Sequence, residues 1–545
     1  MAEGKGKVVK QAAFLMTAQM ISSVIGLLYR GPLHATMGDL GDGYYQFAYE
    51  WYTIILLLAS YSIPSAVSKV MSERLAVRQY RHAQKVFKGA VIYVSIAGGI
   101  GALVALIGGP LFLSSQPDAV LALQVLAPTI LLSGFLGVLR GFFQAHNTMK
   151  QTAISQVAEQ LLNAIFSVLM AFLLTRPYVG DERLTAKFGA AGGTIGTGAG
   201  VLTGLLLMLF AYYLNRDLIN RRIRSDQHDH EESYKKVVKV IFMMCTPIIL
   251  ATCVYNVTVI VDQVLYTHFM NMHGYNPDNI SKLYGLFGFR ARPIINIPIA
   301  LASATSTALI PAVAASVAEK STDGVISKVD ECIKLTSFIA IPATVGIAIL
   351  SYPIMFALFP GGGADGAAEL LSWSAISVIF YSLSTVMNGA LQGSGHPSIP
   401  VRNTVIALVI NLIVMLIMVG PLNLHIYSIV AAMVVYSLAV LVLNTISIYR
   451  RVGYLPEPGQ FAAPVKSAVV MGVAVAVIYW IPSLLLPSFF RRYLPSAILL
   501  VISVIVGILV YFAVYGRVSD LSDEEIRKMP MGTRLLGVMR RLHIR

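Results

Sequence analysis

Apolar stretches long enough to cross a lipid bilayer dominate this sequence and leave few folds open to it. A membrane-spanning helix needs about 20 apolar residues, and fourteen stretches of roughly that length can be placed. Their approximate bounds are 10–30, 45–67, 88–113, 119–140, 152–175, 189–214, 237–266, 284–315, 334–358, 368–390, 401–420, 425–449, 464–486 and 494–516. Because 56% of the residues are hydrophobic and only 12% charged, an ordinary soluble enzyme and a disordered chain are both excluded. The sequence predicts an all-α polytopic membrane protein with 14 transmembrane helices.

The distribution of Lys and Arg predicts how the chain is oriented, since basic loops stay on the cytoplasmic side of a membrane. If the N-terminus lies inside, the outside connections carry only Arg176, Arg183, Lys187, Lys282, Arg491 and Arg492. Both termini are therefore expected in the cytoplasm, in agreement with an even number of spans. The net charge of +14 then reflects topology, and no nucleic-acid partner is expected.

Three short patterns occur twice in the chain, as in transporters built from duplicated helix bundles. Gly141, Gln144 and Asn163 recur 248 residues later as Gly389, Gln392 and Asn411, Ile63–Val67 recurs as Ile310–Ala314, and KVVK occurs at Lys7–Lys10 and at Lys236–Lys239. The repeated helices are six spans apart, an even number, so the two halves share one orientation in the membrane. This predicts two parallel-repeat six-helix lobes around a central cavity, plus two C-terminal helices.

The repeat also predicts domain bounds. Spans 1–6 would form an N-terminal lobe over residues 1–225, and spans 7–12 a C-terminal lobe over residues 226–452. The last two helices would occupy residues 453–517, followed by a basic cytoplasmic tail at 518–545. Within the first lobe, four glycines spaced four residues apart predict one helix face that packs closely on a neighbour; they are Gly192, Gly196, Gly200 and Gly204.

The segment Tyr284–Pro311 carries charged and helix-breaking residues inside an apolar stretch: Arg290, Arg292, Pro293 and Pro298. A guanidinium near the bilayer centre costs roughly 2.5–3.5 kcal/mol on insertion scales, so such residues usually face water or a bound anion. Each proline removes a helix hydrogen bond, and broken backbone at membrane depth needs a cavity or protein around it. We expect a bent helix that lines a path for an anionic group.

Four further charged residues lie in or near predicted spans. Arg30 and Glu50 sit near the outer ends of spans 1 and 2, either reaching toward interfacial water or at the rim of the cavity. Glu159 lies inside span 5 and needs a partner or water. Asp262, in span 7, fits a salt-bridge partner, a cation or proton site, or a lone polar residue near the outer interface.

Several sequence patterns of catalysis are missing. The sequence has no P-loop, no combination of nucleophile, base and orienting group, and no His/Cys metal cluster. Translocation, rather than an enzyme reaction, is therefore expected, with no cofactor. The driving force would be the membrane potential or an ion gradient, since moving one charge across 100 mV supplies about 2.3 kcal/mol.

Some motifs resemble a known family. They are Ser23–Gly26 before Arg30, the spacing Arg292–Pro298–Leu309-Ile310-Pro311, the turns GFFQAHN and LQGSGHP, and LSDEEIRKMPMG near the C-terminus. With these motifs the chain resembles, over essentially its full length, the multidrug/oligosaccharidyl-lipid/polysaccharide (MOP) exporter superfamily. Within that superfamily it looks like the MurJ-type lipid II flippases and the branch that includes stage V sporulation protein B relatives.

The resemblance implies a flippase of the bacterial plasma membrane that moves an undecaprenyl-pyrophosphate-linked sugar outward. It implies that Arg292, Arg290 and Arg30 bind the pyrophosphate, and that the last two helices form a groove for the polyprenyl tail. Membrane lipids and the cell-wall synthesis machinery would be its partners. Ser23 and the segment LLASYSIPSAV stand where the better-known branch has arginines, so the resemblance supports a lipid-linked oligosaccharide more firmly than lipid II.

Two other hypotheses remain open. A cation-coupled small-molecule exporter of the same fold would depend on Asp262 or Glu50, with Glu159 a further candidate for ion coupling or a salt bridge. A non-transporting scaffold for envelope or sporulation assembly would tolerate changes at these charges. The guanidinium groups favour the flippase, because bidentate arginines suit a pyrophosphate.

Overall fold

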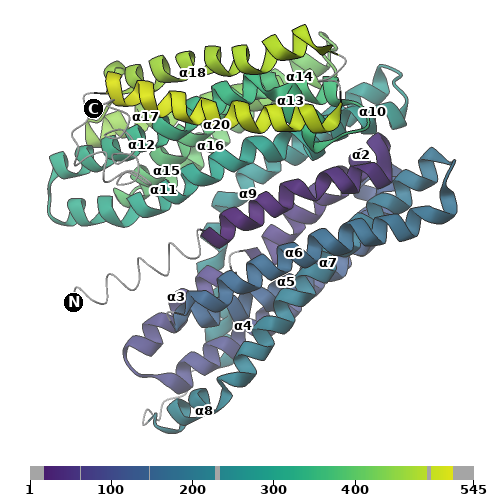
Figure 1. Ribbon diagram of the computed structural model, residues 1–545. Coiled ribbons are helices and arrows are strands. Elements are labelled where there is room, and N and C mark those ends of the chain that lie inside the picture. Colours follow the sequence, from purple (N-terminus) through teal and green to yellow (C-terminus); the bar gives the residue numbers. More distant parts are fainter. Residues whose placement is uncertain (1–16, 62, 147, 227–232, 488–491, 520–545) are drawn as a thin grey trace. The chain divides into compact units, whose positions relative to one another are not determined.

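A computed structural model describes residues 17–61, 63–146, 148–226, 233–487 and 492–519. These residues form helices and contain no strand (Figure 1), which confirms the predicted all-α class. The first copy of KVVK, the residues 227–232 and the tail from residue 520 lie outside the described part of the chain.

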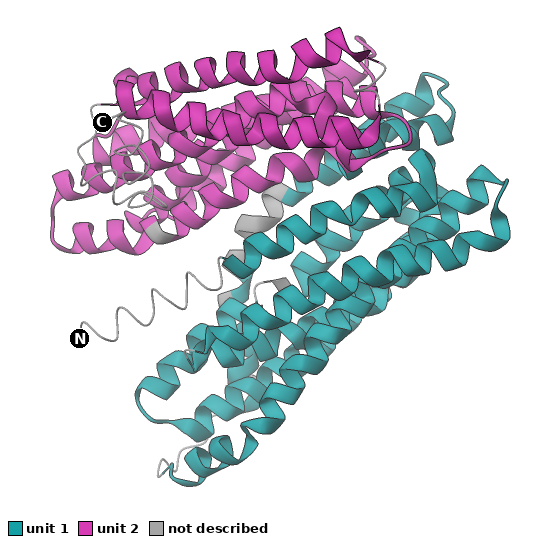
Figure 2. Ribbon diagram, viewed as in Figure 1, with its two compact units in different colours: residues 1–289 teal, residues 290–545 magenta. Residues whose placement is uncertain are grey.

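Chain contacts divide the molecule into two units, residues 1–289 and residues 290–545 (Figure 2). The helices of unit 1 are α2 (Arg30–Leu56), α3 (Ile63–Ala76), α4 (Tyr80–Phe112), α5 (Val120–Ala145), α6 (Met149–Thr175), α7 (Glu182–Leu214), α8 (Arg216–Arg224), α9 (Tyr234–Met272) and α10 (Pro277–Gly285). Short helical turns are η1 (Leu57–Tyr61), η2 (Pro117–Ala119) and η3 (Arg176–Tyr178). A π-helical turn, η4 (Leu286–Ala291), spans the boundary between the units.

Unit 2 continues the helical chain. Its helices are α11 (Arg292–Ala318), α12 (Thr322–Ile349), α13 (Ser351–Leu358), α14 (Ala364–Ser374), α15 (Ser377–Gly393), α16 (Ser398–Val419), α17 (Tyr427–Val452), α18 (Pro458–Leu485) and α20 (Tyr493–Val518). Helix α15 packs against α11, α12 and α17, while α18 packs against α12 and α20.

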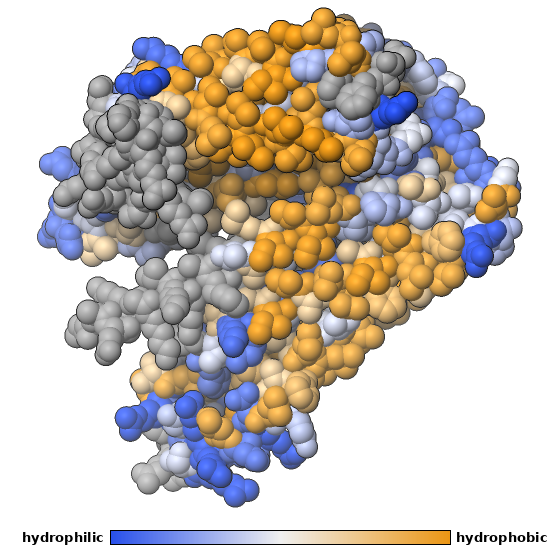
Figure 3. Space-filling view, in the orientation of Figure 1, coloured by the Kyte–Doolittle hydropathy of each residue, from blue (hydrophilic) through white to orange (hydrophobic). Residues whose placement is uncertain are grey.

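Among the described residues, eleven helices are long and apolar enough to cross a membrane, or twelve if the bent pair α14 and α15 forms one span. Two predicted spans fall outside this count. In span 10–30 the described residues include a shorter apolar helix, Thr17–Leu28, and span 237–266 lies within the 39 residues of α9. Figure 3 shows broad hydrophobic faces over the helices of each unit, with hydrophilic residues gathered at helix ends such as that around α8. A multi-pass membrane protein is therefore confirmed, and the count of fourteen stays a prediction.

The division by contacts falls at a different place from the predicted lobe boundary. Helices α9 and α10 pack on helices of unit 1, α9 on α2, α3 and α4 and α10 on α2, so the division comes after Phe289 rather than after residue 225. Span 7, predicted as the first of the C-terminal lobe, thus belongs by packing to unit 1. The lobes at 1–225 and 226–452, the helices at 453–517 and the tail at 518–545 remain predictions from the repeat.

Close packing of α7 on α6 follows from the predicted glycine spacing. A Cβ atom added at Gly192 would lie 2.6 Å from the Cα of Ala171, and one at Gly196 would lie 2.2 Å from the backbone nitrogen of Ser167. Real Cβ atoms essentially never come so close. Small residues let membrane helices approach in this way, so the interpretation of the stripe as a packing face is confirmed.

The internal repeat is visible inside each unit. In unit 1, a Cβ on Gly141 of α5 would lie 2.8 Å from the carbonyl oxygen of Pro64 and 2.9 Å from Val67. In unit 2, a Cβ on Gly393 of α15 would lie 2.7 Å from the carbonyl oxygen of Ile310 and 2.9 Å from Val313. Gly389, the sequence counterpart of Gly141, also packs on α11, one helical turn earlier. The repeated tracts therefore make similar helix contacts, with the glycine contact shifted by one turn.

Candidate functional site

Arg30, the first residue of α2, is held by the residue that ends unit 1. Its Nη1 donates to the carbonyl oxygen of Phe289 over 2.6 Å, and its guanidinium carbon lies 4.8 Å from the centre of the Phe289 ring. Tyr45 packs edge-on against the same ring at 5.3 Å. A cation over an aromatic face is attracted by the ring quadrupole, so this half-buried guanidinium is fixed in place by Phe289.

Arg290 is fully buried in unit 2, with 0% of its surface exposed. Its Nη1 donates to the carbonyl oxygen of Gly362 over 3.0 Å, and its guanidinium carbon lies 5.4 Å from the centre of the Phe359 ring. Gly361 and Gly362 have φ angles of 151° and 146°, which side chains rarely allow. The sequence predicts a turn at Phe359–Asp365, but it does not reveal that this turn binds an arginine.

Arg292 opens α11 and is partly exposed. It follows the π-helical turn η4 and precedes Pro293, whose missing N–H is tolerated at the start of a helix. The expected break in the helix is therefore present, as a π turn running directly into a proline start. Among the three predicted arginines, Arg292 and Arg30 keep some exposure in their own units and Arg290 does not.

Glu50 lies in the interior of unit 1, with 6% of its surface exposed. Gln46 donates its Nε2–H to Glu50 Oε1 over 3.0 Å, and the hydroxyl of Tyr284 donates to Oε2. Tyr284 stacks on Phe47 at 4.4 Å between ring centres. The carboxylate thereby joins α2 to α10. It does not reach toward interfacial water, which was one of the two interpretations of its position.

The other two predicted carboxylates belong to different helices of unit 1. Glu159 on α6 accepts a hydrogen bond from Arg140 Nη2 over 2.6 Å, and Ser155 accepts one from Arg140 Nε over 3.1 Å. Arg140 is therefore the partner of Glu159, which was expected to need a partner or water. Asp262 on α9 is 6% exposed, and its roles as a salt-bridge partner or as a cation or proton site stay predictions.

A cluster that the sequence analysis missed lies near the start of α2. His34 Nδ1 is 3.0 Å from an oxygen of Asp42, and Nε2 is 4.0 Å from an oxygen of Asp39. The backbone of Gly38, with φ 70°, kinks the helix between them. The two carboxylates thus approach opposite nitrogens of one imidazole, whereas a metal ion binds a single nitrogen. The geometry favours a hydrogen-bonded cluster over a metal centre.

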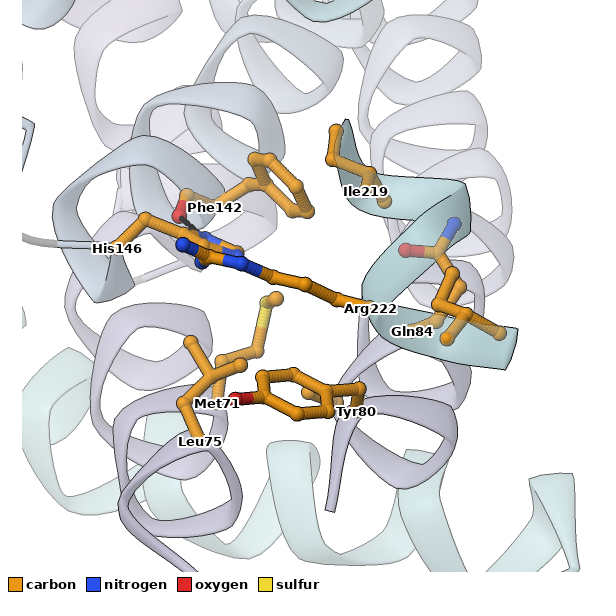
Figure 4. A pocket seen from close by; sticks show the side chains of 10 residues that line it. Met71, Leu75, Tyr80, Gln84, Phe142, His146, Ile219 and Arg222 are labelled. Carbon is orange, nitrogen blue, oxygen red and sulfur yellow. Dashed lines mark hydrogen bonds between the residues drawn. The ribbon is translucent and has the colours of Figure 1, made fainter. Parts of the chain in front are cut away.

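The first repeated turn borders a small cavity next to α8 (Figure 4). The cavity holds about 20 Å³, enough for one water molecule. Arg222 reaches from α8 toward His146 at the end of α5, and His146 Nδ1 is 2.9 Å from the carbonyl oxygen of Phe142. Burial lowers the pKa of His146, and the positive charge of Arg222 acts in the same direction. This turn is packed rather than open to a ligand.

The fold and the buried charges of its helices define a polytopic membrane protein. A family model described as polysaccharide biosynthesis protein matches residues 8–317, and a model described as MatE matches residues 291–417. The chain therefore belongs to the polysaccharide biosynthesis protein family, within the MOP superfamily of flippases and transporters, and is not an enzyme.

Similar proteins support this assignment. The chain is 25% identical to "Lipid II flippase MurJ" of Bacillus subtilis (strain 168) over 96% of this chain and 98% of that protein. It is 22% identical to "Stage V sporulation protein B" of the same organism, over 73% of this chain and 75% of that protein. The solved structure "Lipid II flippase MurJ, inward closed conformation" matches with a TM-score of 0.62 at 15% identity, covering 92% of this chain and 97% of that chain.

Proposed function

We propose that this protein is a flippase that moves lipid II, the undecaprenyl-pyrophosphate-linked peptidoglycan precursor, from the inner to the outer leaflet of the bacterial plasma membrane. Similarity to a lipid II flippase along almost the whole chain carries this proposal. Alternating access of two lobes would carry the headgroup across, with both termini in the cytoplasm. The cell-wall synthesis machinery would receive the product.

The anionic pyrophosphate is the part of the substrate that arginines would bind, because planar guanidinium groups bind phosphate oxygens in pairs. We rank Arg292 first, since it is partly exposed at the start of α11. Arg30 ranks second, because its Nη1 already donates to Phe289. Arg290 would contribute only if its contacts with Gly362 and Phe359 open.

The polyprenyl tail would lie along α18 and α20. These two helices pack against each other and expose several large apolar side chains, among them Val469, Val473, Ile505 and Leu509. Apolar surface of this kind suits contact with a lipid chain, because removing both apolar surfaces from water is favourable. The tail could then stay in the membrane while the headgroup crosses.

Transport would be driven by the membrane potential or an ion gradient, with no cofactor. Glu50 and Asp262 are the proposed coupling carboxylates, since a buried ionisable residue within a membrane helix usually marks an ion or proton site. Glu159 ranks below them, because Arg140 already neutralises it.

Complementation of bacteria depleted of their own lipid II flippase tests the proposal. We expect the unmodified chain to restore growth, and Arg292→Ala to abolish rescue at equal expression. Arg402→Ala is the matched control, since Arg402 is an exposed arginine near the start of α16 and should leave rescue intact. Failure of the well-expressed unmodified chain would overturn the lipid II assignment and favour another lipid-linked oligosaccharide.

A cation-coupled small-molecule exporter is the second candidate, because the MatE model matches residues 291–417 and Glu50 and Asp262 are among the carboxylates buried in unit 1. This function would make Asp262→Asn or Glu50→Gln abolish activity while Arg292→Ala has a mild effect. Because coupling carboxylates would matter in both functions, Arg292→Ala is the variant that separates them.

A further inference from the structure

Unit 1 contains a second, larger cavity of about 250 Å³, away from the three predicted arginines. It lies between α2, the end of α4 with the turn that follows, and α9. The lining residues are Phe47, Trp51, Leu111, Phe112, Leu113, Ser114, Ser115, Gln116, Gln263, Val264 and Thr267. By the Lys and Arg distribution, the turn after α4 faces the outside of the cell.

The lining of this cavity has an aromatic and aliphatic side and a hydroxyl and amide side. Trp51 and Phe112 stack at 4.6 Å with an angle of 8° between their planes. Ser114, Ser115 and Thr267 supply neutral polar groups. Among the described lining residues none is charged, so a phosphate or a cation entering here would lose its hydration without a countercharge, at high cost.

Among the described residues, two side chains that line the cavity each carry a polar atom without a hydrogen-bond partner. Gln263 is 2% exposed, and its Oε1 is buried and unpaired. The indole Nε1 of Trp51 is likewise buried and unpaired. Gln116, by contrast, is bonded at both ends of its amide, accepting from Ser281 over 2.7 Å and donating to the carbonyl oxygen of Pro277 over 3.2 Å. Both side chains line the cavity, although the two atoms are themselves buried beside it. Because buried polar groups normally have partners, a turn of each side chain toward the cavity would let both atoms bond to a ligand.

We propose that this cavity is a binding site for a single neutral sugar ring. A pyranose has an apolar face of C–H groups and a rim of hydroxyls that both donate and accept, which matches the lining and the two unpaired atoms. The volume is below the roughly 300–1,000 Å³ of sites for drug-sized ligands, so it takes one ring and not an oligosaccharide. With these two side chains turned toward the cavity, Gln263 Oε1 would accept from one hydroxyl and Trp51 Nε1–H would donate to another.

The inference deepens the proposed function, since it assigns part of a lipid-linked glycan to a site separate from the arginines that would bind the pyrophosphate. Its test does not require transport. A protein that fails to complement can still bind a free sugar, and a working flippase can fail to bind one here, so the two proposals fail separately.

Binding is measured on the full-length protein in phosphatidylcholine nanodiscs, which avoid glycoside detergents. The substitutions Trp373→Phe and Trp480→Phe leave Trp51 as the one tryptophan reporter among the three in the chain. We expect methyl glucoside to change Trp51 fluorescence saturably. Glucose 6-phosphate should bind at least roughly tenfold more weakly, because its charge would be buried without a partner.

Gln263→Leu should weaken methyl glucoside binding roughly tenfold, since a hydrogen bond and its acceptor are removed from a buried site. Gln156→Leu is the matched control: Gln156 on α6 also has a buried, unpaired Oε1 but does not line the cavity, so affinity should not change. The sugar site would be overturned if methyl glucoside shows no saturable binding, or if Gln263→Leu binds it with unchanged affinity. It would also be overturned if methylcyclohexane, which has no hydroxyl groups, produces the same saturable fluorescence change.

Discussion

The two units link equivalent helices through different polar side chains. The offset of 248 residues that relates their repeated turns also relates the ends of α5 and α15, at Ala145 and Gly393. Applied to Arg140 and Ser155, it leads to Asn388 and Asn403. In unit 1, Arg140 binds Ser155 and Glu159. In unit 2, Asn388 is instead part of a chain of neutral amides.

The amide chain connects three helices of unit 2. Asn444 on α17 donates to Asn388 Oδ1 over 2.7 Å, and Asn403 on α16 donates to Asn444 Oδ1 and to Ser447, each over 2.9 Å. The counterpart of Glu159 in this unit is Ala407. The repeat therefore preserves a polar link between neighbouring helices. At these positions unit 1 has a charged pair and unit 2 has neutral amides, and charged groups are the costlier ones to place in a membrane.

The largest expected effect comes from breaking the charged link. Glu159→Ala should lower the free energy of unfolding by about 2–3 kcal/mol, because Arg140 would remain in a partly buried place without its carboxylate; a fully buried pair would cost about 3–5 kcal/mol. Thermal melting of the protein in detergent, followed by size-exclusion chromatography with fluorescence detection, measures the loss.

Neutralising both partners makes that test specific to the comparison. The double variant Arg140→Asn with Glu159→Ala reproduces the residues of unit 2 at these positions and should recover at least half of the loss. If the double variant is as unstable as Glu159→Ala, the ion pair is not what the single substitution disrupts. If it is stable but does not complement, the charged pair of unit 1 serves transport rather than folding.

The glycine contacts test whether the two units are packed alike. Gly141→Ala and Gly393→Ala should each destabilise the protein by about 1–2 kcal/mol, since the new methyl groups would lie 2.8 and 2.7 Å from backbone oxygens and overpacking costs about this much. Gly99→Ala on α4 is the control, because a Cβ there meets nothing within 4 Å. Melting temperatures that differ widely between the first two variants would contradict equivalent packing.

The sequence predicted the parts of the molecule that depend on local pattern. Apolar length gave the all-helical membrane fold, four-residue spacing gave the packing face of Gly192 and Gly196, and the arginine and prolines of span 8 gave a break at η4 and α11. Each of these follows from residues close together in the chain, where helix geometry alone decides which side chains share a face.

Contacts between distant residues were not predictable in the same way. Arg30 lies 259 residues from Phe289, and Arg290 lies 72 residues from Gly362. Nothing in a single sequence shows that a turn of glycines presents its carbonyl to an arginine. The neutral cavity between α2, α4 and α9 was missed for the same reason, since Trp51 and Gln263 are ordinary residues of apolar spans until the helices bring them together.

The smallest expected effect comes from the amide chain of unit 2. Asn444→Leu removes the group that accepts from Asn403 and donates to Asn388, yet hydrogen bonds between membrane helices contribute only about 0.6 kcal/mol on average and about 1.7 at most. We expect a loss of about 1 kcal/mol in the free energy of unfolding, below that of Glu159→Ala in the same melting assay. Asn220→Leu, at an exposed position of α8, controls for a general effect of replacing asparagine. A loss for Asn444→Leu as large as that for Glu159→Ala would mean that neutral and charged links support their units equally, and the contrast between the two units would then lie in transport alone.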